Sequence, residues 1–185
     1  DTYVFRSDTT IDKVVDRLTG QFEKVWVGLT KKPDGPRKGP IARMQLLIIA
    51  SLIEKESKHP DEQKKIARVF FNRLESGMKL QTDPTCVYGE NLYRQKPHPK
   101  YCRNPASKYS TYVIGGLPPT PISNPGRTAL SAALHPFDGK NSSKLLFFVA
   151  RGDGSGRHVF SRNYRDHKRA VKAYVKAVKS TRQPK

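Results

Sequence analysis

The feature that most constrains this chain is an almost uninterrupted apolar run, LLIIASLI, at residues 46–53. Glu54, Lys55 and Glu56 follow it directly. The run is much shorter than the roughly 20 apolar residues that span a bilayer, so it predicts a buried helix over about 41–57. A helix that simply meets water could end in this way. A helix that carries one carboxylate into an apolar cleft would look the same.

A helical wheel separates the two glutamates. At about 100° per residue, Ser51 and Lys55 fall on the polar side, Glu54 lies near its edge, and Glu56 lies within the apolar sector. Burial would raise the pKa of Glu56, as a general acid at neutral pH requires. Fraying into solvent, or pairing with a lysine, is the simpler alternative, and helix geometry alone favours it. The core side is predicted to consist of Leu46, Ile49, Ala50 and Ile53.

The remaining pattern is mainly helical. Apolar spacing predicts a helix that begins after caps at 8–10 and continues to Trp26, and another from Pro60 to Gly77. A third helix is expected after a cap at Asn124, and a fourth at about 163–179. Four short segments complete the prediction: a strand at 2–5, a loop at 30–40, and strands at 144–150 and 157–161 joined as a hairpin.

These elements predict an α+β fold, with a helical core, a small antiparallel hairpin and long loops. We expect residues 1–40 to be a strand–helix segment and linker, the remainder of an upstream region. Residues 41–185 are expected to form the main domain.

The stretch from 78 to 124 is predicted to be mostly loop, and so long an irregular segment in a compact domain is usually functional. Cys86 and Cys102 bracket part of it. From the residues alone, two free thiols and one disulfide are equally acceptable. The five histidines show no paired metal-ligand spacing, so no metal site is predicted.

The formal net charge of +19 indicates an anionic partner, such as nucleic acid, a phospholipid surface or an acidic polymer. Most of the basic residues are scattered, which is typical of a solvated surface. The segment 162–185 is dense in basic residues and also predicts an amphipathic helix.

Several motifs occur in a specific order: ASLIEKES, IARVFFNRLESGMKLQTDPT, YSTYVIGGLPPTPISNPGRTALSAALHP and LLFFVARGDGSGRHVFSRNYRDHKRAVKAY. Together they resemble the YceG-like family of endolytic murein transglycosylases over about 46–174. The resemblance implies cleavage of the β-1,4 bond between N-acetylmuramic acid and N-acetylglucosamine within nascent peptidoglycan strands. The products would carry 1,6-anhydro ends.

The family places its catalytic glutamate second in the E-K-E element, which corresponds to Glu56. One carboxyl is enough, because the sugar's own 6-hydroxyl serves as nucleophile, and no metal or cofactor is implied. The long loop would contribute saccharide contacts. The candidate residues are Gln81, Thr82, Asp83, Tyr88, Tyr109, Tyr112 and Asn124.

Each contact has a structural alternative: Asp83 in a turn, Asn124 as a helix cap, and the tyrosines in the core. Ser110 and Thr120 depart from the family pattern, in which asparagine and glycine are common. Because of both departures, the resemblance does not determine the detailed substrate contacts at these positions.

The resemblance also implies a location in the bacterial periplasm, with an N-terminal inner-membrane anchor that is absent from this chain. That oxidising compartment favours a Cys86–Cys102 disulfide. Peptidoglycan strands are the implied partner, and cell-wall synthases are candidate partners.

Two rival functions follow from other features. A non-catalytic peptidoglycan-binding scaffold would use the same loop. A nucleic-acid-binding protein would explain the charge, but the sequence has no recognisable nucleic-acid-binding motif, and its basic residues avoid the Tyr- and Pro-rich loop. We therefore expect no nucleic-acid partner.

Overall fold

The computed structural model describes residues 2–31, 42–89, 92 and 95–182. The chain divides into two compact units, Asp1–Gly35 and Pro36–Lys185. The predicted loop at 30–40 and the expected boundary at residue 40 fall largely on residues 32–41, outside the described residues. No described helix is long and apolar enough to cross a membrane.

The first unit contains one long helix, α1 (Ile11–Thr30), which confirms the predicted helix. The Thr10 hydroxyl caps it by accepting a hydrogen bond from the Lys13 amide. The strand predicted at 2–5 is wrong, because these residues are irregular and Val4 is 94% exposed. A strand needs a partner, and no described residue of this unit is in a strand.

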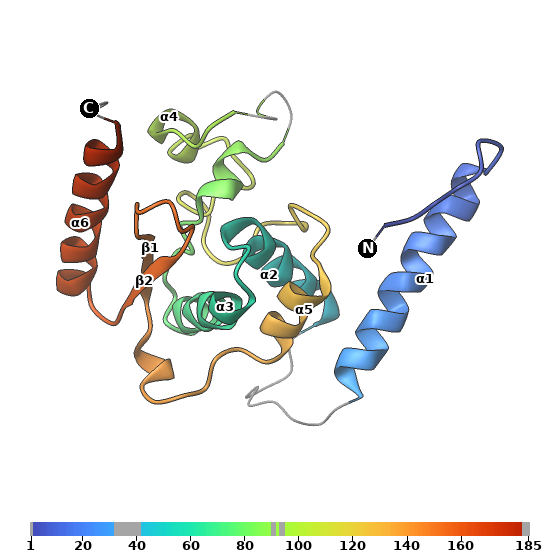
Figure 1. Ribbon diagram of the computed structural model, residues 1–185, viewed down its shortest axis with the longest axis horizontal. Helices are drawn as coiled ribbons and strands as arrows, with labels where there is room; N and C mark the ends of the chain where they lie inside the picture. The colour runs from blue at the N-terminus through green and yellow to red at the C-terminus, as the bar shows by residue number, and fades with distance from the viewer. Residues whose placement is uncertain (1, 32–41, 90–91, 93–94, 183–185) are drawn as a thin grey trace. The chain divides into compact units, whose positions relative to one another are not determined.

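The core of the second unit is built by three helices, α2 (Arg43–Glu56), α3 (Pro60–Glu75) and α5 (Arg127–Leu134), which pack together (Figure 1). The predicted core face of α2 is confirmed, since Leu46, Ile49, Ala50 and Ile53 are all buried. The polar position predicted for Ser51 is wrong. Its hydroxyl is buried, donates to the carbonyl of Ile48 and accepts from the amide of Ile122. Because both bonds are made, the buried hydroxyl carries little penalty.

Helix α3 begins at Pro60 and is followed by Gly77, as predicted. Gly77 has φ +66°, and the Met78 amide donates to the Arg73 carbonyl at 2.8 Å. This left-handed turn satisfies carbonyls at the helix end. It also starts the segment that returns past the end of α2.

Helix α5 does not have the predicted N-cap. Its cap residue is Gly126 rather than Asn124. The Gly126 amide donates to the Glu54 carboxylate at 3.1 Å. A carboxylate at this position interacts favourably with the positive end of the helix dipole, so a side chain from α2 supplies the cap.

The long segment after α3 contains two short helical turns, η1 (Asp83–Val87) and α4 (Pro99–Cys102). A disulfide joins Cys86 in η1 to Cys102 in α4. Both cysteines are buried, and the linkage holds the two turns together.

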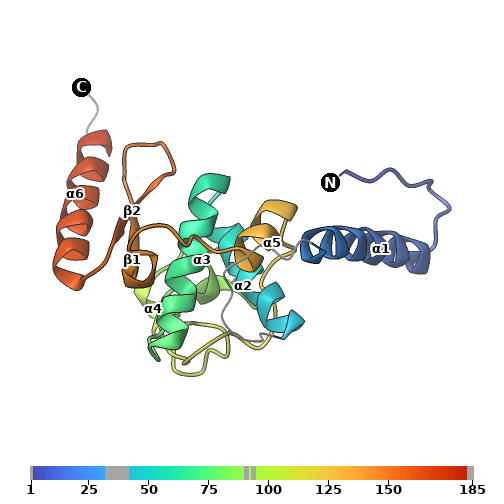
Figure 2. The same ribbon diagram turned by 90° about the horizontal axis from the view of Figure 1, so that it is seen from below.

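The chain ends in a hairpin and a helix. After the turn η2 (Ser142–Lys144), strands β1 (Phe147–Ala150) and β2 (His158–Ser161) pair antiparallel, with Phe147 opposite Ser161. Helix α6 (Tyr164–Arg182) packs on this hairpin, which lies between α6 and the core helices (Figures 1 and 2). The α+β class is confirmed.

Candidate active site

Glu56 occupies the last turn of α2, and Ser57 leaves the helix in an extended conformation. The Glu56 side chain is only partly accessible to solvent. Burial raises the pKa of Glu56 to about 7, the negative charge of Asp83 adds to the rise, and the Thr82 hydroxyl and the Arg73 guanidinium oppose it. The carboxyl therefore holds its proton over part of the neutral range, as a proton donor requires.

Thr82 and Asp83 reach Glu56 through a strained turn. Gln81 has φ +49°, a left-handed conformation that a residue with a Cβ rarely adopts. Its amide donates to the Thr111 carbonyl at 3.2 Å, and the Thr82 amide donates to the Thr111 hydroxyl at 2.9 Å. These bonds fix the turn against the segment that carries Tyr112. Backbone strain of this kind is often found at functional sites.

A buried group of threonines holds the two segments in register. The Thr85 hydroxyl donates to the Thr82 carbonyl at 2.6 Å and lies 3.0 Å from the Thr111 hydroxyl. The Thr82 hydroxyl oxygen is buried and has no hydrogen-bond partner of normal geometry in the described part of the chain. The Thr82 side chain lowers the pKa of the Glu56 carboxyl. Its hydroxyl is therefore available to a proton donor or acceptor at that carboxyl.

Tyr112 holds Asp83 in place. Its hydroxyl donates to the Asp83 carboxylate at 2.6 Å. Burial raises the pKa of Tyr112, and the bond to Asp83 raises it further, so the phenol remains a donor. Asp83 itself is exposed, and its negative charge acts on the Glu56 carboxyl.

Arg73 is a member of this cluster that the sequence analysis missed. It lies on α3 and is buried, and its guanidinium donates to the carbonyls of Leu146 and Leu80 at 2.7 and 2.8 Å. Burial lowers the pKa of Arg73, and the charge of Glu56 opposes that shift. The sequence does indicate that Arg73 is buried, because it follows Phe70 by three residues and Ile66 by seven, on the core side of α3.

Tyr88, Tyr109 and Asn124 have other surroundings. Tyr88 and Tyr109 pack edge to face with ring centroids 4.8 Å apart, and the Tyr109 hydroxyl lies 2.9 Å from that of Thr120. Asn124 is exposed before α5. Ser110 is buried and donates to the Cys102 carbonyl at 2.6 Å, which is a structural contact. The structure thus brings Thr82, Asp83 and Tyr112 near Glu56.

Glu54, two residues before Glu56, has a structural contact instead, since it accepts the Gly126 amide. Ser57 is likewise structural: it is buried, and its hydroxyl accepts the His59 amide at 3.1 Å. The two glutamates of the E-K-E element therefore face different surroundings.

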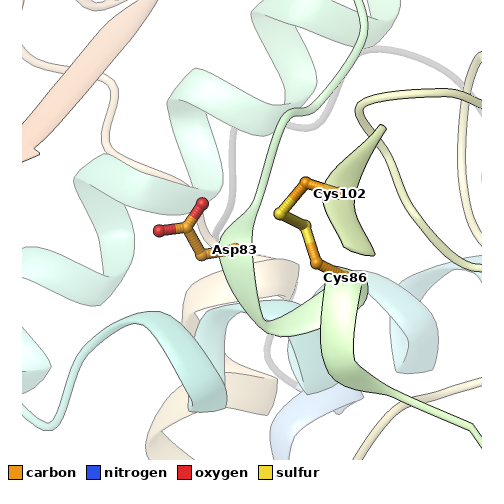
Figure 3. A group of neighbouring side chains, drawn as sticks. All are labelled: Asp83, Cys86 and Cys102. Carbon is orange, nitrogen blue, oxygen red and sulfur yellow. A yellow bond between two sulfur atoms is a disulfide. The ribbon is translucent and has the colours of Figure 1, made fainter. Parts of the chain in front are cut away.

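Asp83 and the two cysteines place potential metal-ligand atoms within 4.8 Å of one another (Figure 3). The sulfurs of Cys86 and Cys102 are bonded to each other, however. Metals bind the thiolate form of cysteine, so this group is no metal centre while the disulfide is closed.

A pocket elsewhere in the unit contains none of these residues. It lies between the β1–β2 loop and α6, and its lining includes Gly152, Gly154, Tyr174 and Val178. Its one ionisable group with a full charge is Arg157, which pairs with Asp61 at 2.7 Å. The chemistry therefore points to the surroundings of Glu56.

Comparisons with known proteins identify the family. The profile of the YceG-like family matches residues 1–173. A protein of Bacillus subtilis (strain 168) named endolytic murein transglycosylase is 34% identical over 175 residues, covering 94% of this chain and 46% of that protein. One of the same name from Streptococcus pneumoniae serotype 2 (strain D39) is 29% identical over 178 residues, covering 94% of this chain and 31% of that protein.

A solved structure is similar as well. The 2.6 Å crystal structure of a yceG-like protein from Listeria monocytogenes has a TM-score of 0.73 and 33% sequence identity, covering 91% of this chain and 52% of that one. The chain thus spans about half the length, or less, of the relatives that it matches.

Proposed function

Because the chain belongs to the YceG-like family, we propose that it contains the catalytic region of an endolytic murein transglycosylase. The family match and the names of the relatives support this activity. The observation that carries the proposal is the partly buried Glu56 carboxyl, whose pKa is raised to about 7 beside Thr82 and Asp83.

In the proposed reaction, protonated Glu56 donates its proton to the glycosidic oxygen between N-acetylmuramic acid and N-acetylglucosamine. The bond from that oxygen to C1 breaks, and its electron pair stays on the leaving oxygen. The muramic acid 6-hydroxyl then bonds to C1 and gives its proton to the Glu56 carboxylate. The product has a 1,6-anhydro end, and Glu56 is again protonated.

This scheme explains why one proton-exchanging carboxyl is enough. Glycoside hydrolases usually use two, because water or an enzyme nucleophile must attack the sugar. Here the nucleophile belongs to the substrate, so the same glutamate serves as acid and then as base. Each step transfers one proton, and the reaction requires no metal or cofactor.

Asp83 has a supporting role in this proposal. Its negative charge makes ionisation of Glu56 less favourable and would also stabilise positive charge developing on the sugar ring. The Tyr112 hydroxyl directs that carboxylate, and Arg73 limits the rise in the Glu56 pKa. Asp83 is a positioning and electrostatic group rather than a second proton donor.

The saccharide contacts remain predictions. Gln81 and the exposed edge of Asp83 offer hydrogen-bonding groups at the turn. Tyr88 and Tyr109 present ring faces suited to pyranose rings. Asn124 would contribute an amide from the other side of α2, which packs against α5.

We also propose that the protein works outside the cytoplasm, in the periplasm. The Cys86–Cys102 disulfide supports this, because such linkages persist in oxidising compartments. Attachment to the inner membrane by a segment outside this sequence, and association with cell-wall synthases, remain predictions.

Digestion of purified sacculi tests the proposal. The protein should release fragments with 1,6-anhydro ends, detected by mass spectrometry. Glu56→Gln should lower their rate of formation by at least about 100-fold, since general acid–base catalysis contributes on that order or more. Glu54→Gln is the matched control: it retains an oxygen that can accept the Gly126 amide, and it should leave the products unchanged.

The same assay separates the rival functions. A peptidoglycan-binding scaffold would bind sacculi without releasing anhydro products. Full activity of Glu56→Gln would refute the assigned acid. Tight binding to duplex DNA that persists at physiological salt would favour the nucleic-acid alternative.

A further inference from the structure

Helix α6 carries a concentrated basic face. At about 100° per residue, the basic side chains of its described part fall within an arc of about 100°. All are exposed: Arg165, Lys168, Arg169, Lys172, Lys176 and Lys179. We call these six residues the basic face. It runs for about 21 Å at 1.5 Å per residue.

The opposite side of α6 attaches the helix to the unit. His167 stacks on Phe147 with ring centroids 5.0 Å apart, and the Tyr174 ring lies against Gly152. His167 and Tyr174 fall about 150° and 170° from the centre of the basic face. The hairpin therefore fixes the helix so that the basic face points to solvent.

Acidic residues of α6 neutralise little of the positive charge of this face. Asp166 is the one acidic residue in the α6 sequence, and it lies about 60° outside the arc, on the side of Arg169. It accepts from Asn163 at 2.8 Å and lies 3.5 Å from Arg169. Like charges held this close raise the free energy of the protein alone, and an anionic partner relieves that repulsion.

One edge of the basic face is apolar. Tyr164 and Val175 lie within about 20° of each other on the helical wheel, about 16 Å apart along the helix, and are 61% and 44% exposed. The Lys168 ammonium lies 5.2 Å from the Tyr164 ring centroid. A bilayer surface accommodates both features, because lysine and arginine contact phosphates while aromatic and aliphatic groups enter the headgroup region.

We propose that the basic face of α6 is a docking surface for a bilayer that contains anionic phospholipids. A flat anionic surface contacts one side of a straight helix along its whole length, which matches the arrangement of the six cations. A linear polyanion would satisfy the charges and leave the Tyr164–Val175 edge in water. The proposal does not depend on the enzymatic activity, because binding is measured without turnover.

Vesicle co-sedimentation tests the docking surface. The protein should bind vesicles of equal parts phosphatidylcholine and phosphatidylglycerol, should not bind phosphatidylcholine alone, and should dissociate as salt is raised. Substitution of Lys172, Lys176 and Lys179 by Gln should weaken binding roughly 100-fold, because each cation contributes about a fivefold gain at an anionic surface.

The matched control removes the same charge from exposed positions of the same unit: Lys64→Gln, Lys108→Gln and Lys140→Gln. It should weaken binding far less. An equal loss in the two triple variants would show that net charge alone is responsible, and would overturn the proposal. So would failure of the parent to bind anionic vesicles at low salt.

A fluorescent reporter distinguishes the bilayer from a linear polyanion. Trp26→Phe combined with Val175→Trp leaves one tryptophan, at the apolar edge. Its emission should shift to the blue with anionic vesicles and should not shift with long-chain inorganic polyphosphate. Binding of both ligands without a shift would overturn the bilayer in favour of the polyanion.

Discussion

Two carboxylates near the junction of α2 and α3 differ in the donors that surround them. Glu62, in the first turn of α3, is buried and accepts the His158 backbone amide at 3.2 Å and the His158 ring nitrogen at 2.9 Å. Arg157 lies 3.7 Å from it. Glu56 lies at the end of α2, where the Thr82 side chain lowers its pKa and the negative charge of Asp83 raises it.

This difference explains how the same type of side chain serves two functions. A buried carboxylate supplied with several donors links elements, here α3 to the hairpin, and its loss leaves those donors unpaired. A carboxyl with few donors and a negative neighbour gains and loses its proton near neutral pH. The local supply of donors, rather than burial alone, distinguishes the structural glutamate from the proposed catalytic one.

The largest expected effect is on stability, at the linking carboxylate. Glu62→Ala should lower the free energy of unfolding by about 3–5 kcal/mol, as removal of one partner from a buried pair does. Urea denaturation measures the change. Asp61→Ala is the control: its pair with Arg157 is exposed, so the cost should stay below about 1 kcal/mol. Equal losses would show that Glu62 is no stronger a link than a surface residue.

The second prediction also concerns stability, but here substitution of the carboxyl, Glu56, is expected to stabilise the protein at high pH. The folded-state pKa of about 7 exceeds the usual value, so the folded form binds a proton that the unfolded form has lost between about pH 4.5 and 7. The parent protein should therefore lose stability as pH rises through this window, by roughly 1–3 kcal/mol.

Gln does not titrate, so Glu56→Gln should lack this loss and be more stable than the parent at pH 8 but not at pH 4. Denaturation at the two pH values measures the difference. If the difference in stability between the parent and Glu56→Gln were the same at pH 4 and pH 8, a raised pKa at Glu56 would be contradicted.

The smallest expected effect concerns the position of Asp83 beside the proposed catalytic carboxyl. Tyr112→Phe removes the hydroxyl that directs Asp83, and kcat/KM for anhydro-product formation should fall about tenfold. Activity should decline above about pH 7, where Glu56 loses its proton. In the variant the decline should begin at lower pH, because a displaced Asp83 no longer raises the Glu56 pKa.

Tyr109→Phe is the matched control, since its hydroxyl contacts Thr120 rather than a carboxylate. It should leave the pH dependence in place. A pH profile that is identical in the parent and Tyr112→Phe would remove Asp83 and Tyr112 from the proposed proton chemistry.

Local pattern was sufficient for much of this molecule. Apolar spacing located the helices to within a few residues, Pro60 and Gly77 marked the ends of α3, and two apolar segments joined by RGDGSG predicted the hairpin. The wheel distinguished Glu56 from Glu54, because the orientation of a side chain on a helix depends on its position in the turn. The basic face of α6 is also visible in the order of its residues.

Contacts between distant segments needed the folded chain. Ser51 is buried because the segment at 122–123 covers it, Gly126 is the cap of α5 because Glu54 reaches it, and residues 2–5 lack a strand to pair with. Arg73 and Tyr112 meet Glu56 from segments far away in the chain. Helical periodicity is a short-range property, whereas desolvation and the donors around a carboxyl depend on which remote segments pack against it.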